Sequence, residues 1–156
     1  MEVVNIKKAI IVAKKIKKEG KRLVVVGGSF DILHVGHVIY LEKAKKKGEV
    51  LMVLLESDER IKRIKGENRP INKQADRAKL LSSLRMVDIV VCLRDMKDNS
   101  DYDELLTKIK PSIIAVEGSD KILKIKKRQA KMVGAKLMVV TKRVGEYSSS
   151  KVVEVI

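Results

Sequence analysis

The sequence predicts an α/β fold, a single doubly wound five-stranded parallel sheet with an additional N-terminal helix. The first observation behind this prediction is that short aliphatic runs alternate with stretches of helical periodicity along the chain. The second is that several of these runs are apolar throughout, as expected for strands that are buried on both faces. Residues 1–20 are predicted to form a helical extension, and residues 21–156 are predicted to form the main domain.

Turn residues and helix caps divide the chain into elements. The expected strands cover residues 23–26, 50–55, 87–92, 113–116 and 137–140. Asn5 can cap an amphipathic helix that Gly20 ends, and Asn72 can cap a later helix. The expected helices after the first strand run up to residue 47 and then over 58–65, 73–84, 102–109, 120–133 and a short final segment. Polar residues that follow parallel strands meet at the carboxyl ends of the sheet, where one site can collect them.

The stretch of residues 24–41, VVVGGSFDILHVGHVIYL, predicts a phosphate-binding site. A β-branched strand breaks at Gly27 and Gly28, and the first turn of the following helix brings His34 and His37 to the same side. Free backbone N–H groups and the helix dipole favour an anion there, and Gly36 lets a ligand approach because it has no Cβ. These are the only two histidines and no cysteine lies near them, which disfavours a zinc site.

The block GGSFDILHVGH resembles the H-x-G-H signature of the cytidylyltransferase-like nucleotidyltransferases. Enzymes of that family transfer a nucleotidyl group from CTP or ATP to a phosphate monoester and release pyrophosphate. The resemblance implies a Rossmann-like fold, and it implies that His34 and His37 are catalytic. The nucleotide-binding residues that it implies in this block are Gly27, Gly28, Ser29, Phe30, Asp31 and Gly36.

A second block, SDERIKRIKGENRPINKQADRAKLLSSLRMVDIVV, is most similar to the adenylyltransferase domain of ADP-heptose synthase, which makes a nucleotide-sugar from a sugar 1-phosphate. The resemblance implies that Lys65 is catalytic and lies against the triphosphate. The acceptor-binding residues that it implies are Asp58, Arg69 and Arg85. Arg77 and Arg85 also have a structural alternative. Each can instead form an ion pair with Asp76 or Asp88.

The end of the chain, TKRVGEYSSSKVVEVI, resembles the last motif of the family, in which an arginine precedes a serine run that opens a helix. The resemblance implies that Arg143 is catalytic, because an arginine fork suits phosphate oxygens. It implies that the β- and γ-phosphates are bound by Ser148, Ser149 and Ser150. A simple serine cap of the last helix is the alternative.

The resemblance implies in-line transfer of AMP from ATP to a sugar 1-phosphate-like acceptor, with Mg²⁺ on the triphosphate and no metal site formed by the protein alone. Gly118 and Asp120 match the family's run after the fourth expected strand and are assigned to the nucleotide. The residues that depart from this run, and leave the acceptor open, are Glu117, Ser119 and Lys121. Three alternatives stay open: CTP with glycerol 3-phosphate, as in glycerol-3-phosphate cytidylyltransferase; FMN, as in FAD synthetase; and a nucleotide- or nucleic-acid-binding module without catalysis.

The net charge of +15 first suggests a nucleic-acid partner. With only 3% aromatic residues there is no stacking platform, so solvated helix faces and attraction of polyphosphate substrates are the preferred interpretation. No apolar run reaches the roughly 18–20 residues of a membrane span. With the single cysteine Cys92, this predicts a cytoplasmic protein. Abundant Lys and Glu suggest a hyperthermophilic source, and the amphipathic first helix suggests a homodimer.

Overall fold

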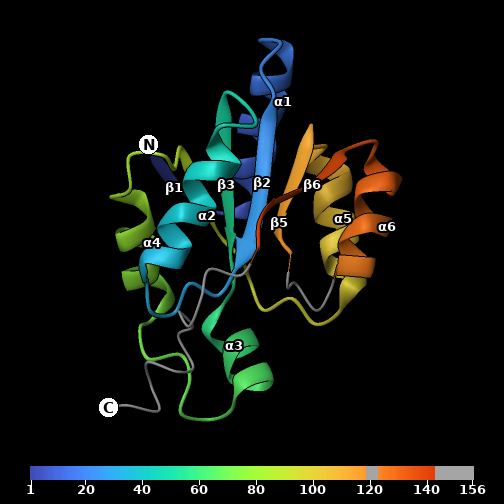
Figure 1. The fold of residues 1–156 in the computed structure, drawn as a ribbon. Helices are drawn as coiled ribbons and strands as arrows, with labels where there is room; N and C mark the ends of the chain where they lie inside the picture. Colours follow the sequence, from blue (N-terminus) through green and yellow to red (C-terminus); the bar gives the residue numbers. More distant parts are fainter. Residues whose placement is uncertain (119–122, 143–156) are drawn as a thin grey trace.

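The computed structural model describes residues 1–118 and 123–142, which form one parallel sheet between two layers of helices (Figure 1). The strand order is β1-β4-β3-β2-β5-β6, and every pair is parallel. The strands are β1 (Glu2–Val4), β2 (Leu23–Gly28), β3 (Val50–Leu55), β4 (Ile89–Cys92), β5 (Ile113–Glu117) and β6 (Lys136–Thr141).

The α/β class and the parallel sheet are confirmed, but the predicted number of five strands is wrong, because the described residues form six. The additional strand is β1, whose three residues pair with β4 from Glu2 opposite Ile89 to Val4 opposite Val91. A run of three residues is too short to show a strand period, so only its pairing with β4 reveals it.

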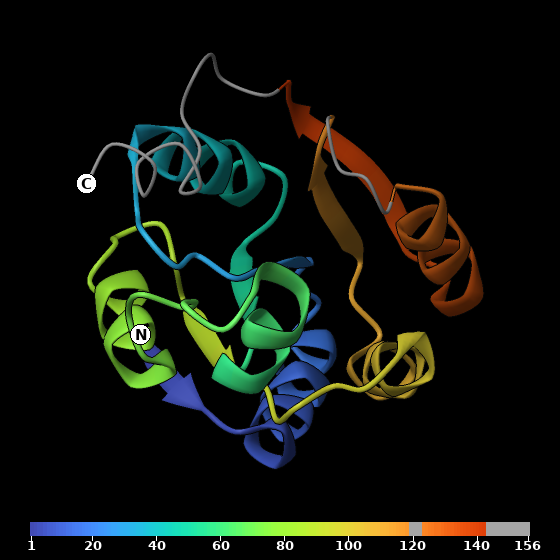
Figure 2. The same ribbon diagram turned by 90° about the horizontal axis from the view of Figure 1, so that it is seen from below.

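The helices are divided between the two faces of the sheet (Figure 2). Their bounds are α1 (Ile6–Lys18), α2 (Val35–Lys45), α3 (Asp58–Lys65), α4 (Gln74–Ser82), α5 (Asn99–Ile109) and α6 (Leu123–Val133). One apolar cluster joins α2 and α4 to one face, and a second joins α1, α5 and α6 to the other. Helix α3 lies beyond the carboxyl ends of the strands (Figure 1).

Helix α1 is packed within the fold of its own chain. Ala9, Ala13 and Ile16 are buried in the same cluster as Val25 and Met52 of the sheet. The apolar face on which the dimer prediction rested therefore covers the sheet of the same chain. The division at residue 20 stays a prediction, although β1 and α1 share the sheet and the core with the rest of the chain.

Several helix caps agree with the sequence. The Asn5 side chain accepts a hydrogen bond from the Lys8 amide at 3.0 Å, which confirms that it caps α1. Two other helix starts differ from the expectation. Helix α4 begins after Lys73, without the expected cap, and α5 begins at Asn99 because the Asp98 carboxylate accepts from the Ser100 amide at 2.8 Å.

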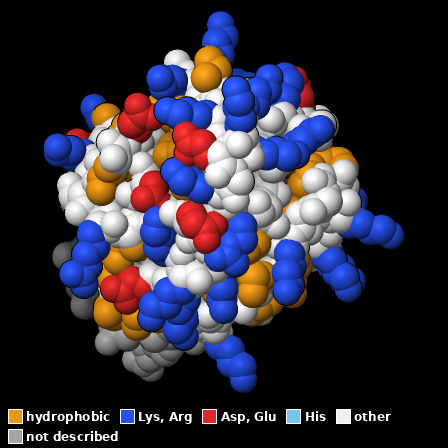
Figure 3. All heavy atoms as spheres, turned by 90° about the horizontal axis from the view of Figure 1, so that it is seen from above, with side chains coloured by type: hydrophobic (Ala, Val, Ile, Leu, Met, Phe, Trp, Pro, Cys, Tyr) orange, Lys and Arg blue, Asp and Glu red, His pale blue; other side chains and the backbone are white. Residues whose placement is uncertain are grey.

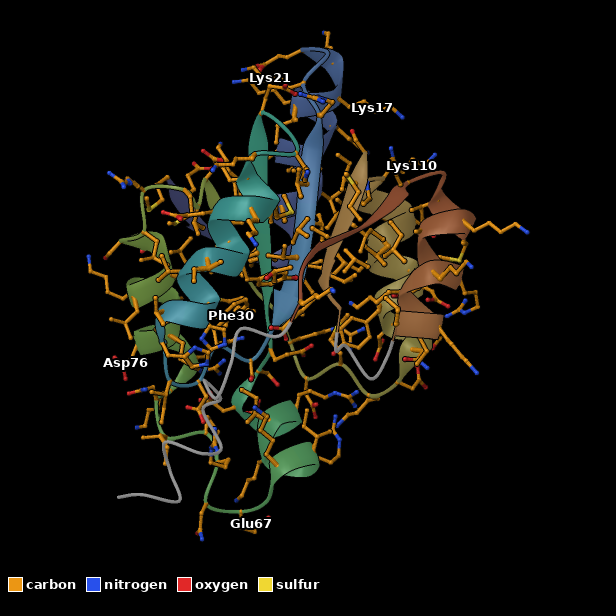
Figure 4. All side chains as sticks on the ribbon, in the orientation of Figure 1. Lys17, Lys21, Phe30, Glu67, Asp76 and Lys110 are labelled. Atoms are coloured by element: carbon orange, nitrogen blue, oxygen red, sulfur yellow. The ribbon has the colours of Figure 1, made fainter. Side chains whose placement is uncertain are left out.

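The topology separates two ends of the sheet. Because β2 continues to β3 on one side and β5 continues to β6 on the other, the strand order reverses between β2 and β5. Ligands of such sheets bind outside the carboxyl ends at this point. Phe30 lies at this end, and Lys17, Lys21 and Lys110 lie at the other (Figure 4).

The end opposite Phe30 carries much of the positive charge. Lys and Arg side chains spread over it with Asp and Glu side chains between them (Figure 3). The Arg22 guanidinium donates to both carboxylate oxygens of Glu49, and Lys21 pairs with Glu19 at 2.7 Å, so part of this charge is balanced locally. Within the described ranges, no helix combines the length and apolarity needed to cross a membrane.

Candidate active site

The two histidines meet at the start of α2. His34 is the N-cap residue of α2, and His37 lies on the first turn, where its amide donates to the His34 carbonyl at 3.0 Å. The two rings are stacked, with centroids 3.8 Å apart and planes inclined by 21°. The Phe30 ring lies 5.1 Å from His37 on centroids. The structure thus holds both imidazoles together on one side of the helix start, as the spacing predicts.

Burial lowers the pKa of both histidines. For His34, the charge of Glu117 opposes this effect. For His37, the neighbouring His34 and Lys65 add to the effect of burial and bring its pKa to about 4. His37 is therefore neutral at pH 7, and its ring carries one N–H donor and one acceptor nitrogen. Among the described residues, its buried Nδ1 atom has no hydrogen-bond partner.

The lowered pKa of His37 predicts a loss of stability in mild acid. Since His37 binds its proton less readily in the folded chain, its contribution to stability is complete above the ordinary pKa of 6.5 and falls as the pH drops toward 4. At pH 5 the loss should be about 2 kcal/mol. Urea unfolding at pH 7 and pH 5 should show a smaller loss for His37→Gln than for the unmodified chain. Equal losses would contradict this explanation.

The glycine turn is shaped around Phe30. The Phe30 backbone has φ of +43°, and its buried ring lies so close to Gly28 that a Cβ there would be 2.9 Å from its Cε2 atom. A side chain at residue 28 would therefore displace the ring that packs against His37. At Gly27, a Cβ would lie 3.7 Å from the Nζ atom of Lys126, which reaches this turn from α6.

Lys65, the last residue of α3, lies at the same turn. Its Nζ atom donates to the Ser29 hydroxyl at 3.0 Å. Burial lowers the pKa of Lys65, and the neighbouring Arg69 lowers it further, whereas Asp31 opposes the shift. The predicted lysine is therefore next to the motif, where an anion would compensate its partial desolvation.

Asp31 organises the loop that follows α3. It is fully buried, and its carboxylate accepts from Arg69 Nε at 2.6 Å and from the amides of Ile71 and Asn72 at 2.8 and 3.0 Å. The Asn72 side chain, expected to cap α4, instead donates to the Asp31 carbonyl at 2.7 Å. Asp31 thus positions this loop, since its oxygens are already used by protein donors.

Arg77, on α4, connects the residue that follows β2, the residue that follows β3 and the first residue of α3. Its fully buried guanidinium donates to the carbonyls of Ser29 at 2.6 Å and Glu56 at 2.9 Å, and to the Asp58 carboxylate at 2.7 Å. The structural alternative for Arg77 thus holds, but with Asp58 as its partner instead of Asp76 or Asp88. This bond also occupies an oxygen of Asp58, which the sequence assigned to the acceptor.

The structure does not bring Arg85 to this site. It lies between α4 and β4, three residues before Asp88. The Asp88 amide donates to the carbonyl of Leu51, which lies near the amino end of β3. Arg85 is exposed there, at the opposite end of the sheet from the histidines. Asp88 pairs with Lys45 and accepts from the Leu51 amide at 2.7 Å, so it is not a partner of Arg77.

The remaining predicted residues divide into two groups. Gly36 lies in the first turn of α2, and Gly118 follows β5 with its amide donating to the Thr141 carbonyl at 2.8 Å. The predicted residues outside the described part of the chain are Asp120, Arg143, Ser148, Ser149 and Ser150. The sequence reasoning missed Glu56, although a carboxylate directly after a buried strand is a signal that can find such a residue.

No group of three or more His, Cys, Asp or Glu side chains in residues 1–118 and 123–142 is arranged to hold a metal ion. Mg²⁺ is commonly held by one or two carboxylates together with the substrate phosphates, so a site of this kind does not require a protein cage. Asp31 does not suit this role because protein donors occupy its oxygens. The charge of Glu117 acts on His34, so this carboxylate lies close to the histidines.

Comparison with known proteins tests the predicted family. The cytidylyltransferase-like family model matches residues 25–155. The chain is 50% identical over 110 residues to the bifunctional protein HldE of a Nitratiruptor species and 48% identical over 108 residues to that of Aliarcobacter butzleri. These alignments cover 70% and 69% of this chain but only 23% and 22% of the relatives, so the chain spans less than a quarter of their length.

Solved structures agree with the fold. A lipopolysaccharide core biosynthesis protein from Thermoplasma volcanium matches with a TM-score of 0.61 and 29% identity, over 83% of this chain and all of that chain. A pantoate-beta-alanine ligase from Francisella tularensis, with a TM-score of 0.71 but 17% identity, shares the fold over 94% of this chain and 69% of its own. Because the family model covers well over half of the sequence, this chain belongs to the cytidylyltransferase-like family.

Proposed function

We propose that the chain transfers AMP from ATP to a phosphate monoester of the sugar 1-phosphate type and releases pyrophosphate in a Mg²⁺-dependent reaction. The observation that carries this proposal is the stacked histidine pair at the start of α2, with Lys65 bonded to Ser29 of the adjoining glycine turn. These groups gather at the carboxyl ends of the strands, where a helix start favours phosphate. The resemblance of the second sequence block to the adenylyltransferase domain of ADP-heptose synthase supports a sugar phosphate as the acceptor.

The residues of this chain would act by positioning and by electrostatics. In an in-line displacement, charge grows on the α-phosphate and on the departing pyrophosphate. His34 and His37 would donate to these oxygens from imidazoles held by stacking and by Phe30. Lys65 would bind the triphosphate, and Asp31 would hold the loop of Arg69 in place behind it. When bound with the nucleotide, Mg²⁺ would neutralise part of the phosphate charge.

A second candidate is transfer of CMP from CTP to glycerol 3-phosphate or a similar alcohol phosphate. The family description favours it, since the matching model is named for cytidylyl transfer. Both candidates use the same histidines and Lys65. They differ in the contacts to the base, which the sequence assigns to loops near residues 117–120 and 141–148, most of which lie outside the described residues.

Release of pyrophosphate tests the proposal directly. ATP or CTP is combined with sugar 1-phosphates, glycerol 3-phosphate or FMN, with and without Mg²⁺. Turnover is expected with ATP, Mg²⁺ and a sugar 1-phosphate. Lys65→Ala should reduce it roughly a hundredfold, because a preorganised donor to the developing charge is lost.

Lys62→Ala is the matched control, because Lys62 lies on the same helix, is half exposed and pairs with Glu67. It should retain the rate of the unmodified chain. Equal rates for Lys65→Ala and Lys62→Ala would contradict the assigned role of Lys65. Nucleotide binding without pyrophosphate release for any acceptor would instead favour a binding module without catalysis.

A further inference from the structure

A carboxylate that this mechanism does not use lies beside the site. Glu56 directly follows β3, and its amide donates to the Gly28 carbonyl at 3.1 Å. Its own carbonyl accepts from Arg77, and the same guanidinium also donates to the Ser29 carbonyl. The Glu56 backbone is therefore bonded directly to the glycine turn. Through the Arg77 guanidinium it is also linked to Ser29, the residue that Lys65 contacts.

The Glu56 side chain lies on the face of the sheet opposite the histidines. Successive residues of a strand alternate in direction, so Glu56 shares its face with Leu54, which packs in the cluster of α1, α5 and α6. From α5, the Tyr102 hydroxyl lies 2.8 Å from both carboxylate oxygens and donates its proton to them. Burial raises the pKa of Glu56, and the hydrogen bond from Tyr102 opposes this shift. Both side chains are partly exposed, so a ligand can reach them.

Three cations act on Glu56. The Arg60 guanidinium lies 5.9 Å from the centre of the Tyr102 ring, and its charge and those of Lys126 and Arg77 favour the ionised carboxylate. Lys126 also reaches Gly27 at the end of β2, as described above. Arg77 is paired with Asp58, but the charges of Arg60 and Lys126 also act on this carboxylate, and positive charge beside it suits a phosphorylated ligand and opposes a cationic one.

The hydrogen-bonding capacity of Glu56 indicates which part of a ligand it would bind. An ionised carboxylate has about four lone-pair sites and only accepts hydrogen bonds. Tyr102 supplies a single O–H donor, and a ligand rich in hydroxyl groups would supply more. A phosphate group drawn by the surrounding cations, together with such hydroxyls, describes a polyol or sugar phosphate.

We infer that Glu56 determines acceptor specificity by accepting hydrogen bonds from the hydroxyl groups of a polyhydroxylated phosphate monoester, while Tyr102 fixes its carboxylate. This inference rests on the proposed function and adds to it the residue that recognises the hydroxyl groups of the acceptor. Glu56 would contact the acceptor itself, and Tyr102 is a positioning residue.

Calorimetric binding of two acceptors to the nucleotide-bound chain tests this inference without requiring turnover. Glucose 1-phosphate carries the hydroxyls, and ethyl phosphate carries the phosphate alone. The unmodified chain should bind glucose 1-phosphate more tightly than ethyl phosphate. Glu56→Gln should weaken the binding of glucose 1-phosphate roughly 10- to 100-fold, because its hydroxyls lose their hydrogen bonds to a charged carboxylate. Its binding of ethyl phosphate and of ATP should stay within about twofold.

Tyr102→Phe keeps the Glu56 carboxylate and should cause a smaller loss of affinity for glucose 1-phosphate. This variant keeps the test valid if Glu56→Gln fails to fold. Glu59→Gln is the control, since Glu59 is an exposed glutamate three residues further on. An unchanged ratio of the two affinities in Glu56→Gln and Tyr102→Phe would overturn the inference. A chain that binds both acceptors with the expected ratio but releases no pyrophosphate would instead contradict the proposed function alone.

Discussion

Replacing His37 with alanine is expected to lower the rate of nucleotidyl transfer roughly 10²–10³-fold, because a preorganised donor to the transition-state charge is removed. His37 is held between His34, at 3.8 Å on ring centroids, and Phe30, at 5.1 Å. Its imidazole is therefore placed before substrate arrives, and no other described side chain occupies this position. The measurement is the initial rate of pyrophosphate release at saturating nucleotide and acceptor.

Val35→Ala is the matched control for this variant. Val35 lies in the same first turn of α2, but its side chain is 47% exposed and takes no part in the ring stack. It should keep the full rate, and circular dichroism should show that both variants fold. A rate for His37→Ala within a few-fold of that for Val35→Ala would disprove the catalytic role of His37.

Replacing Asp31 with alanine is expected to destabilise the fold by about 3–5 kcal/mol, because it leaves a buried charge without its partner. Arg69 is only 8% exposed, and one of its Nη atoms already has no partner among the described residues. The amides of Ile71 and Asn72 would lose their acceptor as well. Urea unfolding at pH 7 measures this change as a lower midpoint with an unchanged slope.

Asp76→Ala is the control for the charge change, since Asp76 is exposed on α4 (Figure 4). Surface substitutions of this kind usually change the free energy of unfolding by less than about 0.5 kcal/mol. If Asp31→Ala were no less stable than Asp76→Ala, the buried ion pair would not hold the loop as described.

Most of the fold follows from the sequence because each central strand is an unbroken aliphatic run with a clear end. For this reason, the strand predicted over residues 50–55 has the same bounds as β3. The sequence could not show β1, since Glu2–Val4 gains its order only from pairing with β4. Local signals also misplaced the start of α5, where the amide and the hydroxyl of Ser100 both donate to the Asp98 carboxylate and fix the boundary.

The site was predictable where residues are close in sequence. His34 and His37 lie three residues apart at the start of α2, so their spacing alone brings them together. Contacts between distant segments were not predictable from spacing. Asp31 reaches Arg69, 38 residues away, and Tyr102 reaches Glu56, 46 residues away. Arg85 shows the converse. It matches a family motif in the sequence, but the path of the chain after α4 takes it to the end of the sheet opposite the histidines.

The pairing of β1 with β4 has a consequence for the solution behaviour of the chain. Without Glu2–Val4, the row of backbone N–H and C=O groups along Ile89–Val91 would have no covering strand. Such an open flank is a template for intermolecular β-pairing and aggregation. With β1 present, the edge of the sheet is a strand of only three residues, which offers little backbone for pairing with another chain. A variant that begins at residue 21 would expose β4 in its place and should self-associate more readily.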